Sequence, residues 1–302
     1  MFTKRKILIT GSSGMLGTDL CRELRGSYEI YGADLAAAPP GRRAAGKYKT
    51  DITDKDGIAG IVKKIRPDIV IHTAAMTDVD GCELDPKKAY KINSGGTRNT
   101  ALACKAAGAV LIYISTDFVF DGKKKKHYKE ADRPRPLGVY ADSKLKGEEA
   151  VKKILKKYFI LRTGWLYGRH GKNFVDTILT KAKSGGALKV VDDQVGSPTY
   201  TKDLTKAIHA LVEKIVSESR VMDRGPVAGI YHVTNSGSVS WFDYAVEILK
   251  RAGLKTKVLP ISSRELARPA KRPAMSILDN SKFSRFTGYS MRNWREALKD
   301  YV

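Results

Sequence analysis

Two side chains near the middle of the chain have the types and the spacing that proton transfer requires. Tyr140 and Lys144 lie four residues apart at the start of a predicted helix, so the phenol and the ammonium group project from the same face. A free tyrosine titrates near pH ~10, and a neighbouring positive charge favours its phenolate. The pair therefore predicts acid–base chemistry, although this spacing alone also arises by chance on protein surfaces.

A polar triplet, Ser115-Thr116-Asp117, follows an apolar run that predicts a buried strand over 109–115. In open α/β folds, ligands bind at the carboxyl ends of the strands, so this triplet is expected beside Tyr140. The Thr116 hydroxyl can hydrogen-bond the oxygen that Tyr140 protonates, and so polarise a carbonyl group while a nicotinamide delivers hydride. Together these residues predict reduction of a keto group.

A glycine-rich loop near the N-terminus has the context of a dinucleotide site, because it follows a predicted strand over 6–10 and opens a helix. Gly11 permits the tight turn, Gly14 lets the backbone approach a pyrophosphate, and Gly17 allows close packing of the helix. The N-terminus of that helix presents free amide hydrogens to the anion. The predicted cofactor contacts in this turn are Gly11, Gly14, Met15, Leu16 and Gly17.

An acidic residue, Asp34, ends the second predicted strand over 28–33, about 20 residues beyond the loop, where a carboxylate can accept a hydrogen bond from the adenosine ribose. Asp34 would repel the 2′-phosphate of NADP, whereas Arg42 and Arg43 can neutralise it. NADPH and NADH therefore both remain candidates for the cofactor.

Short apolar runs alternate with helical periodicity over the first half of the chain, which predicts an α/β fold with a Rossmann-type, doubly wound parallel sheet. Asp51 and Ile52 precede a helix whose apolar positions recur at helical spacing over 58–65. Asp51 either contacts the adenine together with Ile52 or caps this helix, and both interpretations remain open. Further strands are expected over 68–72 and 158–163, and a helix over 144–156.

After Gly164 the predicted elements become shorter. We therefore expect a dinucleotide-binding domain over 1–165 and a smaller, interleaved substrate-binding lobe over 166–302, with segments that return to the first domain. The predicted buried face of a helix over 241–251 consists of Phe242, Ala245, Val246 and Leu249. The other elements expected here are helices over 174–183 and 204–216 and strands over 188–191 and 229–234.

The composition limits the class of protein. The 302 residues include 55 Lys and Arg against 32 Asp and Glu, and the resulting net charge of +23 attracts anionic ligands. These basic residues are dispersed, and the one run, 123–126, lacks interleaved aromatic residues, so nucleic-acid binding is not expected. No apolar run suits a membrane span or a signal peptide. Three cysteines without a CxxC pair fit a reducing cytoplasm and predict neither a disulfide framework nor a zinc site.

The ordered motifs resemble those of the dTDP-4-dehydrorhamnose reductase family, which consists of extended short-chain dehydrogenases/reductases. The similarity runs almost end to end. Beyond the glycine loop, the threonine and the Tyr-x-x-x-Lys pair, it rests on the segments 73–77, 115–122, 162–168, 193–199 and 272–276, and on Asn93. One departure is Ala141, where the family usually has glycine.

The resemblance implies reduction of the 4-keto group of dTDP-4-dehydro-β-L-rhamnose to dTDP-β-L-rhamnose by NADPH or NADH. It implies catalytic roles for Thr116, Tyr140 and Lys144, the last two also contacting the cofactor, with Tyr140 as proton donor. It further implies that Ala74, Ala75 and Met76 line the cofactor and that Thr116, Asp117, Trp165, Gln194 and Arg272 lie near the sugar nucleotide. An arginine such as Arg272 also suits a diphosphate on chemical grounds.

Two other functions share this scaffold. One is a non-catalytic, dinucleotide-binding regulatory subunit resembling that of methionine adenosyltransferase, since fold alone does not determine function. The other is a different sugar-nucleotide enzyme, an epimerase or dehydratase. The complete set of Thr116, Tyr140 and Lys144 favours an enzyme, and Trp165 and Gln194 favour a reductase. A homodimer is a candidate assembly, and no metal ion is expected at the site.

Overall fold

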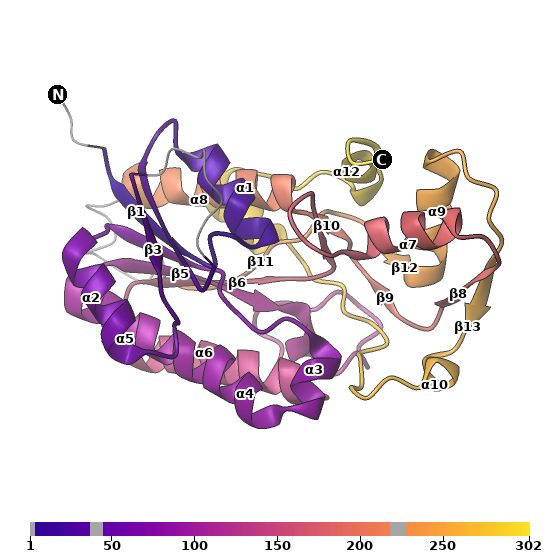
Figure 1. Ribbon diagram of the computed structural model, residues 1–302, viewed down its shortest axis with the longest axis horizontal. Helices are drawn as coiled ribbons and strands as arrows, with labels where there is room; N and C mark the ends of the chain where they lie inside the picture. The colour runs from indigo at the N-terminus through magenta and orange to yellow at the C-terminus, as the bar shows by residue number, and fades with distance from the viewer. Residues whose placement is uncertain (1–3, 37–44, 218–227) are drawn as a thin grey trace.

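The computed structural model describes residues 4–36, 45–217 and 228–302. Its main sheet has seven parallel strands in the order β11-β6-β5-β4-β1-β2-β3 (Figure 1). The strand order reverses between β1 and β4, which opens a crevice at the carboxyl ends of these strands. The predicted Rossmann-type parallel sheet is confirmed. The strands are β1 (Lys6–Thr10), β2 (Glu29–Asp34), β3 (Gly46–Lys49), β4 (Ile69–His72), β5 (Val110–Thr116), β6 (Tyr158–Thr163) and β11 (Gly229–His232).

Helices cover both faces of this sheet (Figure 1). On one face lie α1 (Met15–Leu24), α8 (Thr201–Ser217) and α11 (Ser281–Thr287), and on the other lie α2 (Lys55–Ile65), α5 (Thr97–Ala107) and α6 (Val139–Ile154). Strand side chains alternate between the two layers: Ile7 and Ile9 pack in the core with α1 and α8, whereas Leu8 packs with α2 and α5. Each fully buried aliphatic side chain of this kind contributes roughly 1.5–3 kcal/mol to folding.

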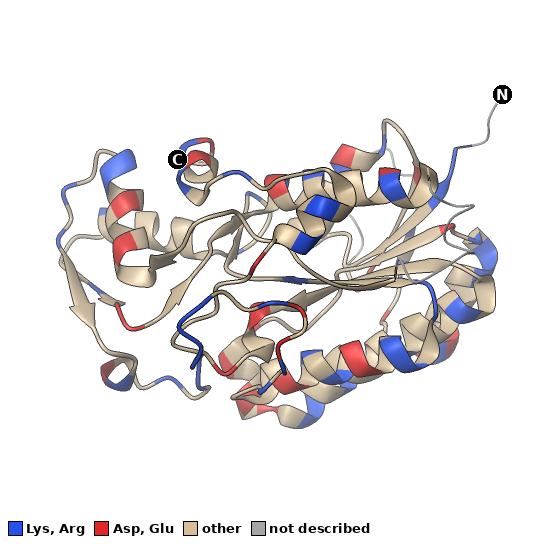
Figure 2. Cartoon of the chain, turned by 180° about the vertical axis from the view of Figure 1, so that it is seen from behind, with Lys and Arg blue, Asp and Glu red and all other residues tan. Residues whose placement is uncertain are grey.

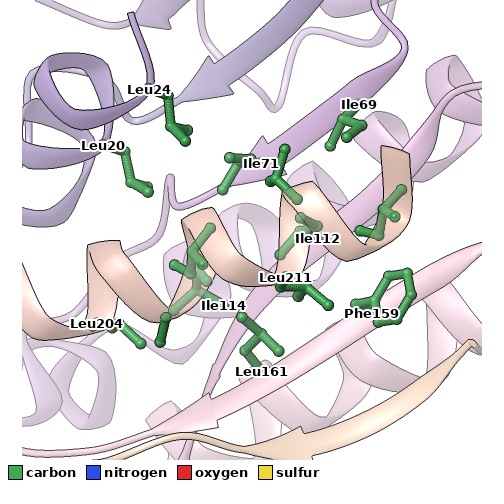
Figure 3. Close-up of a cluster of buried hydrophobic side chains, with 14 of the residues drawn as sticks. Leu20, Leu24, Ile69, Ile71, Ile112, Ile114, Phe159, Leu161, Leu204 and Leu211 are labelled. Atoms are coloured by element: carbon green, nitrogen blue, oxygen red, sulfur yellow. The ribbon is translucent and has the colours of Figure 1, made fainter. Parts of the chain in front are cut away.

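The core between α8 and the sheet shows how distant parts of the sequence build one domain (Figure 3). Leu204 and Leu211 of α8 pack with Ile112 of β5 and Leu161 of β6, and all four side chains are fully buried. The segment 201–217 therefore belongs to the layer that covers the sheet. Likewise, β11 extends the sheet beside β6.

A second lobe lies beyond the carboxyl ends of the strands (Figure 1). Its core joins α7, α9 and α12 with short strands, and it is rich in aromatic side chains. The elements here are β7 (Leu166–Tyr167), α7 (Phe174–Lys183), β8 (Leu188–Val191), β9 (Val195–Gly196), β10 (Thr199–Tyr200), β12 (Val239–Ser240), α9 (Trp241–Arg251), β13 (Val258–Ile261), α10 (Ser263–Leu266) and α12 (Trp294–Lys299).

Several expectations need correction in detail. Ala245 and Leu249 of α9 are buried as predicted, whereas Val246 is 42% exposed. The remaining buried residues of α9 are Tyr244 and Ile248, so the buried face is shifted around the helix from the predicted one. The edge strand β3 and the helix α5 were not expected. The division of the chain at residue 165 stays a prediction. Three elements after this point, α8, β11 and α11, belong to the main sheet and its covering layer.

Between β4 and α5 the chain forms α3 (Val79–Leu84), α4 (Pro86–Tyr90) and a π-helical turn, η1 (Lys91–Gly96). A 3₁₀ turn, η2 (Asp117–Val119), follows β5. Within the described ranges no helix is long and apolar enough to cross a membrane. Figure 2 shows Lys and Arg on helices and loops of both lobes, interspersed with Asp and Glu.

Candidate active site

A cavity of about 870 Å³ lies at the carboxyl ends of the strands, within the roughly 300–1,000 Å³ typical of small-molecule sites. The structure brings all but two of the predicted site residues to this cavity. Those that line it are Gly11, Gly14, Met15, Leu16, Gly17, Asp34, Asp51, Ile52, Ala74, Ala75, Met76, Thr116, Asp117, Tyr140, Lys144 and Trp165.

The glycine loop has the geometry that its sequence predicts. Gly11 has a φ of +73°, and a Cβ atom there would lie 2.7 Å from the Ala74 nitrogen. A Cβ atom on Gly17 would lie 2.1 Å from the Gly11 oxygen, so only glycine lets α1 begin this close to the turn. Gly14 is the exposed N-cap of α1 and provides no side-chain cap, which leaves amide hydrogens of the first turn for an anion.

Two carboxylates lie at the side of the cavity that the second and third strands form. Asp34 accepts a hydrogen bond from the Ser13 amide at 2.9 Å, which ties the end of β2 to the glycine loop. Asp51 accepts one from the Thr53 amide at 2.8 Å, whereas the N-cap of α2 is Asp54. Of the two interpretations of Asp51, helix capping is therefore excluded. Arg42 and Arg43 lie outside the described residues.

The segment after β4, with Ala74, Ala75 and Met76, lines the middle of the cavity. Buried Asn93 of η1 fixes its position, since its Oδ1 accepts the Met76 amide at 2.8 Å and its Nδ2 donates to the Met76 oxygen at 3.1 Å. Asn93 also donates to the Ser143 hydroxyl at 3.0 Å, and so connects this wall of the cavity to α6.

The first turn of α6 carries the phenol. Tyr140 lines the cavity, and burial raises its pKa above the ordinary value, while a hydrogen bond with Thr116 opposes that shift. Thr116 ends β5 and is itself buried. The spacing of the pair predicts a lowered pKa for Tyr140, whereas in the structure burial raises it. At neutral pH the phenol therefore retains its proton and is ready to donate it.

One turn further along α6, the ammonium group of Lys144 is held by two residues of β5. Its Nζ donates to the Ile114 oxygen at 2.7 Å and lies 4.3 Å from the centroid of the Tyr113 ring. Only 3% of the side chain is exposed, and this burial lowers the pKa of Lys144 to about 7, against the attraction of Glu148. The side chain thus changes its charge near neutral pH.

A buried ion pair supports this corner of the site. Arg162 of β6 donates from Nε and Nη2 to the two carboxylate oxygens of Glu148, at 2.9 and 2.6 Å. Glu148 also accepts the Ser115 hydroxyl at 2.6 Å, so α6, β5 and β6 meet at one carboxylate. Both charged side chains are at most 1% exposed.

Asp117 is a buried carboxyl group beside Thr116. Burial raises its pKa to about 7, although hydrogen bonds from Ser276 and Thr116 act in the other direction. Gly164 makes room for it, since a Cβ atom there would lie 2.5 Å from the Asp117 Cγ. The site therefore has a second group that can exchange a proton near neutral pH.

Two indole rings form the wall toward the second lobe. Trp165 has a φ of +52°, in the left-handed region that is costly for a bulky residue. Its ring stacks on Trp241 of α9, with centroids 3.5 Å apart and planes within 1°. Gly196 permits this position, because its Cβ atom would lie 2.4 Å from the Trp165 ring.

Two predicted residues do not line the cavity. Gln194 is 8% exposed and donates to the Ser263 hydroxyl at 2.7 Å. Arg272 donates from Nη1 and Nη2 to the Asp80 carboxylate at 2.7 and 2.8 Å, in an ion pair that ties α3 to the chain near the C-terminus. This pair engages Nη1 and Nη2 of Arg272, and the contact of Arg272 with a diphosphate stays a prediction.

Among the cavity-lining residues that the sequence did not single out, two carry large or charged side chains at the second lobe, Lys172 and Trp241. Trp241 stands at the first position of a correctly predicted helix, and an indole at the start of that helix was the available signal. Lys172 lies in the loop before α7, and its sequence context carried no signal.

The residues present fit a dinucleotide. The glycine loop provides an uncapped helix N-terminus, and the end of β2 provides Asp34. The small residues at 74–75 leave space for the ligand in the cavity. Among the described residues, no group of three or more His, Cys, Asp or Glu side chains could hold a metal ion.

Comparison with known proteins gives a consistent result. The family model described as RmlD substrate binding domain matches residues 5–302. The spore coat polysaccharide biosynthesis protein SpsK of Bacillus subtilis is 39% identical over 298 residues, which cover 98% of this chain and 96% of SpsK. A crystal structure of a dTDP-4-dehydrorhamnose reductase from Clostridium acetobutylicum superimposes with a TM-score of 0.87 at 40% identity over 98% of both chains.

A second crystal structure, dTDP-4-dehydrorhamnose reductase from Bacillus anthracis in complex with NADP, gives a TM-score of 0.86 at 40% identity over 99% of both chains. The resemblance that the motifs indicate is thereby confirmed, as is the prediction of an enzyme. The chain belongs to the dTDP-4-dehydrorhamnose reductase family of extended short-chain dehydrogenases/reductases and is an oxidoreductase of nucleotide sugars.

Proposed function

We propose that the protein reduces the 4-keto group of dTDP-4-dehydro-β-L-rhamnose to a hydroxyl group, at the expense of NADPH or NADH. The observation that carries this proposal is that Tyr140 and Thr116 line the same cavity as the glycine loop. This arrangement places a proton donor within the same cavity as the dinucleotide that the loop fits.

The reduced nicotinamide, when bound, supplies a hydride to the carbonyl carbon. Tyr140 transfers its phenolic proton to the carbonyl oxygen, and its raised pKa keeps the phenol protonated until that oxygen gains negative charge. Thr116 hydrogen-bonds the same oxygen and fixes its direction. Lys144, whose pKa is about 7, lies one helical turn away and can return a proton to the phenolate through the cavity.

The names of the relatives support the proposed identity of the sugar and of the base. The two crystal structures at 40% identity are called dTDP-4-dehydrorhamnose reductases, which supports a dTDP-linked 4-keto sugar. The complex of the Bacillus anthracis protein with NADP supports NADPH as one cofactor. The name of SpsK supports a role for the product in polysaccharide biosynthesis.

The test is oxidation of NADPH or NADH by the purified protein, with dTDP- and UDP-linked 4-keto sugars compared side by side. We expect absorbance of the reduced cofactor to fall with the dTDP-linked sugar and the product to be the 4-hydroxy sugar. Turnover of the UDP-linked sugar alone would change the assigned base. Tight binding of dinucleotide without oxidation in any mixture would instead favour the regulatory subunit, and epimerised product without net oxidation would favour an epimerase.

A further inference from the structure

We propose that Lys172 binds a diphosphate group in the cavity, either that of the dinucleotide or that of the nucleotide sugar. This inference rests on the proposed function, because that function brings two diphosphates into one cavity.

The cavity has few positive charges for such ligands. Among the described residues that line it, the acidic ones are Asp34, Asp51 and Asp117, and the basic ones are Lys144 and Lys172. A diphosphate needs a cation or several amide donors, because its charge is otherwise repelled by these carboxylates.

The other basic candidates are already occupied. Lys144 is 3% exposed and donates to the Ile114 oxygen, so its ammonium group is already bound at the end of β5. Arg272, the residue expected from the sequence to meet a diphosphate, is paired with the Asp80 carboxylate. Lys172 is exposed, and in the described part of the chain its ammonium group has no hydrogen-bond or ion-pair partner.

The loop that carries Lys172 is held by hydrogen bonds to the Gly168 oxygen and packs against the start of α1. The Asn173 side chain donates to the Gly168 oxygen at 2.9 Å, and the Tyr301 hydroxyl donates to the same oxygen at 3.1 Å. Gly171 lies directly against the start of α1, since a Cβ atom on it would be 3.2 Å from the Met15 Cβ. The residue after Gly171 is therefore held next to the uncapped N-terminus of α1.

This position distinguishes Lys172 from a lysine on the solvated surface. The amide hydrogens of α1 approach an anion from one side, and Lys172 enters the cavity from the second lobe beside Met15. A cation on a mobile four-carbon stem suits a phosphate as a point charge. Bound diphosphate would also join the two lobes electrostatically.

The experiment compares Lys172→Met and Lys172→Arg with Lys183→Met. Lys183 is exposed at the C-terminal end of α7, the helix that follows the Lys172 loop, and does not line the cavity, so its replacement removes the same charge without changing the cavity. Three quantities are measured in the full-length proteins: the dissociation constant of NADPH, the KM of the dTDP-linked 4-keto sugar at saturating cofactor, and thermal protection by inorganic pyrophosphate.

We expect Lys172→Met to weaken one diphosphate ligand by about tenfold, as the loss of a charge-assisted hydrogen bond predicts. Lys172→Arg should retain most of the affinity, and Lys183→Met should resemble the wild type. A raised dissociation constant of NADPH assigns Lys172 to the dinucleotide, and a raised KM alone assigns it to the nucleotide sugar. Unchanged values for both ligands, with equal protection by pyrophosphate, would overturn the inference.

Failure of the proposed function gives a different result. If wild-type protein binds pyrophosphate but neither oxidises a cofactor nor binds a nucleotide sugar, the assigned reaction is wrong. Weaker protection of Lys172→Met by pyrophosphate would then still support the anion site, and equal protection would refute it.

Discussion

Replacing Asp117 by asparagine should stabilise the ligand-free protein in a pH-dependent way. Only 2% of Asp117 is exposed, and burial raises its pKa from 3.8 to about 7. Between these two pH values the folded protein holds a proton that the unfolded chain has released. Unfolding therefore releases a proton over this range, and the wild-type free energy of unfolding falls as the pH rises from 3.8 to 7.

The size of the effect follows from the shift. Each pKa unit corresponds to about 1.4 kcal/mol, so the ionised carboxyl group costs the folded protein on the order of 4 kcal/mol above pH 7. About 3 kcal/mol of this loss falls between pH ~5 and ~8. Asparagine has nearly the same shape and cannot ionise, so the variant should not suffer this loss.

The assay is urea denaturation of ligand-free wild-type and Asp117→Asn protein across that pH interval, analysed by linear extrapolation. The difference in free energy of unfolding, variant minus wild type, should grow as the pH rises. Asp51→Asn removes an exposed carboxylate from the same cavity and should show no comparable growth. A difference for Asp117→Asn that stays constant with pH would refute the argument. We also expect its turnover to fall, because Asp117 lines the site beside Thr116.

Three further substitutions test other parts of the site. Tyr140→Phe removes the proton donor, so kcat should fall by about 10²–10⁴-fold while the dissociation constant of NADPH changes little; unchanged kcat would exclude the proposed role. Glu148→Gln leaves Arg162 buried without its partner and should cost about 3–5 kcal/mol in denaturation, whereas Glu148→Leu combined with Arg162→Met should lose less; a larger loss in the double variant would contradict this. Gly17→Ala places a Cβ atom 2.1 Å from the Gly11 oxygen, so it should abolish NADPH binding in a titration; retained affinity would show that the loop adapts.

Much of the fold could be predicted because apolar periodicity reports burial directly. The predicted helices over 174–183 and 241–251 agree in their bounds with α7 and α9. The helix α5 was missed because its buried residues are mainly alanine, threonine and cysteine, which give only a weak apolar stripe. The edge strand β3 has alternating half-exposed residues and no continuous apolar run.

The site residues also differ in how well the sequence could predict them. Residues that are close in the sequence, such as the glycine loop and the Tyr140–Lys144 step, could be predicted from their spacing together with the strand and helix expected around them, and the structure places them at one cavity. Arg272 could not, because its partner Asp80 is 192 residues away in the sequence and the ion pair exists only after folding. The direction in which the pKa of Tyr140 shifts could not be predicted either, because it is set mainly by burial, which depends on tertiary packing.

The stacked indoles of Trp165 and Trp241 make one wall of the cavity optically observable. Parallel rings with centroids 3.5 Å apart couple their electronic transitions strongly, and that coupling declines steeply as the rings separate or tilt. The chain has three tryptophans, and the third, Trp294, is 1% exposed in the core of the second lobe, where it contributes a constant background. Near-ultraviolet circular dichroism of unlabelled protein can therefore follow this wall of the cavity as ligands bind.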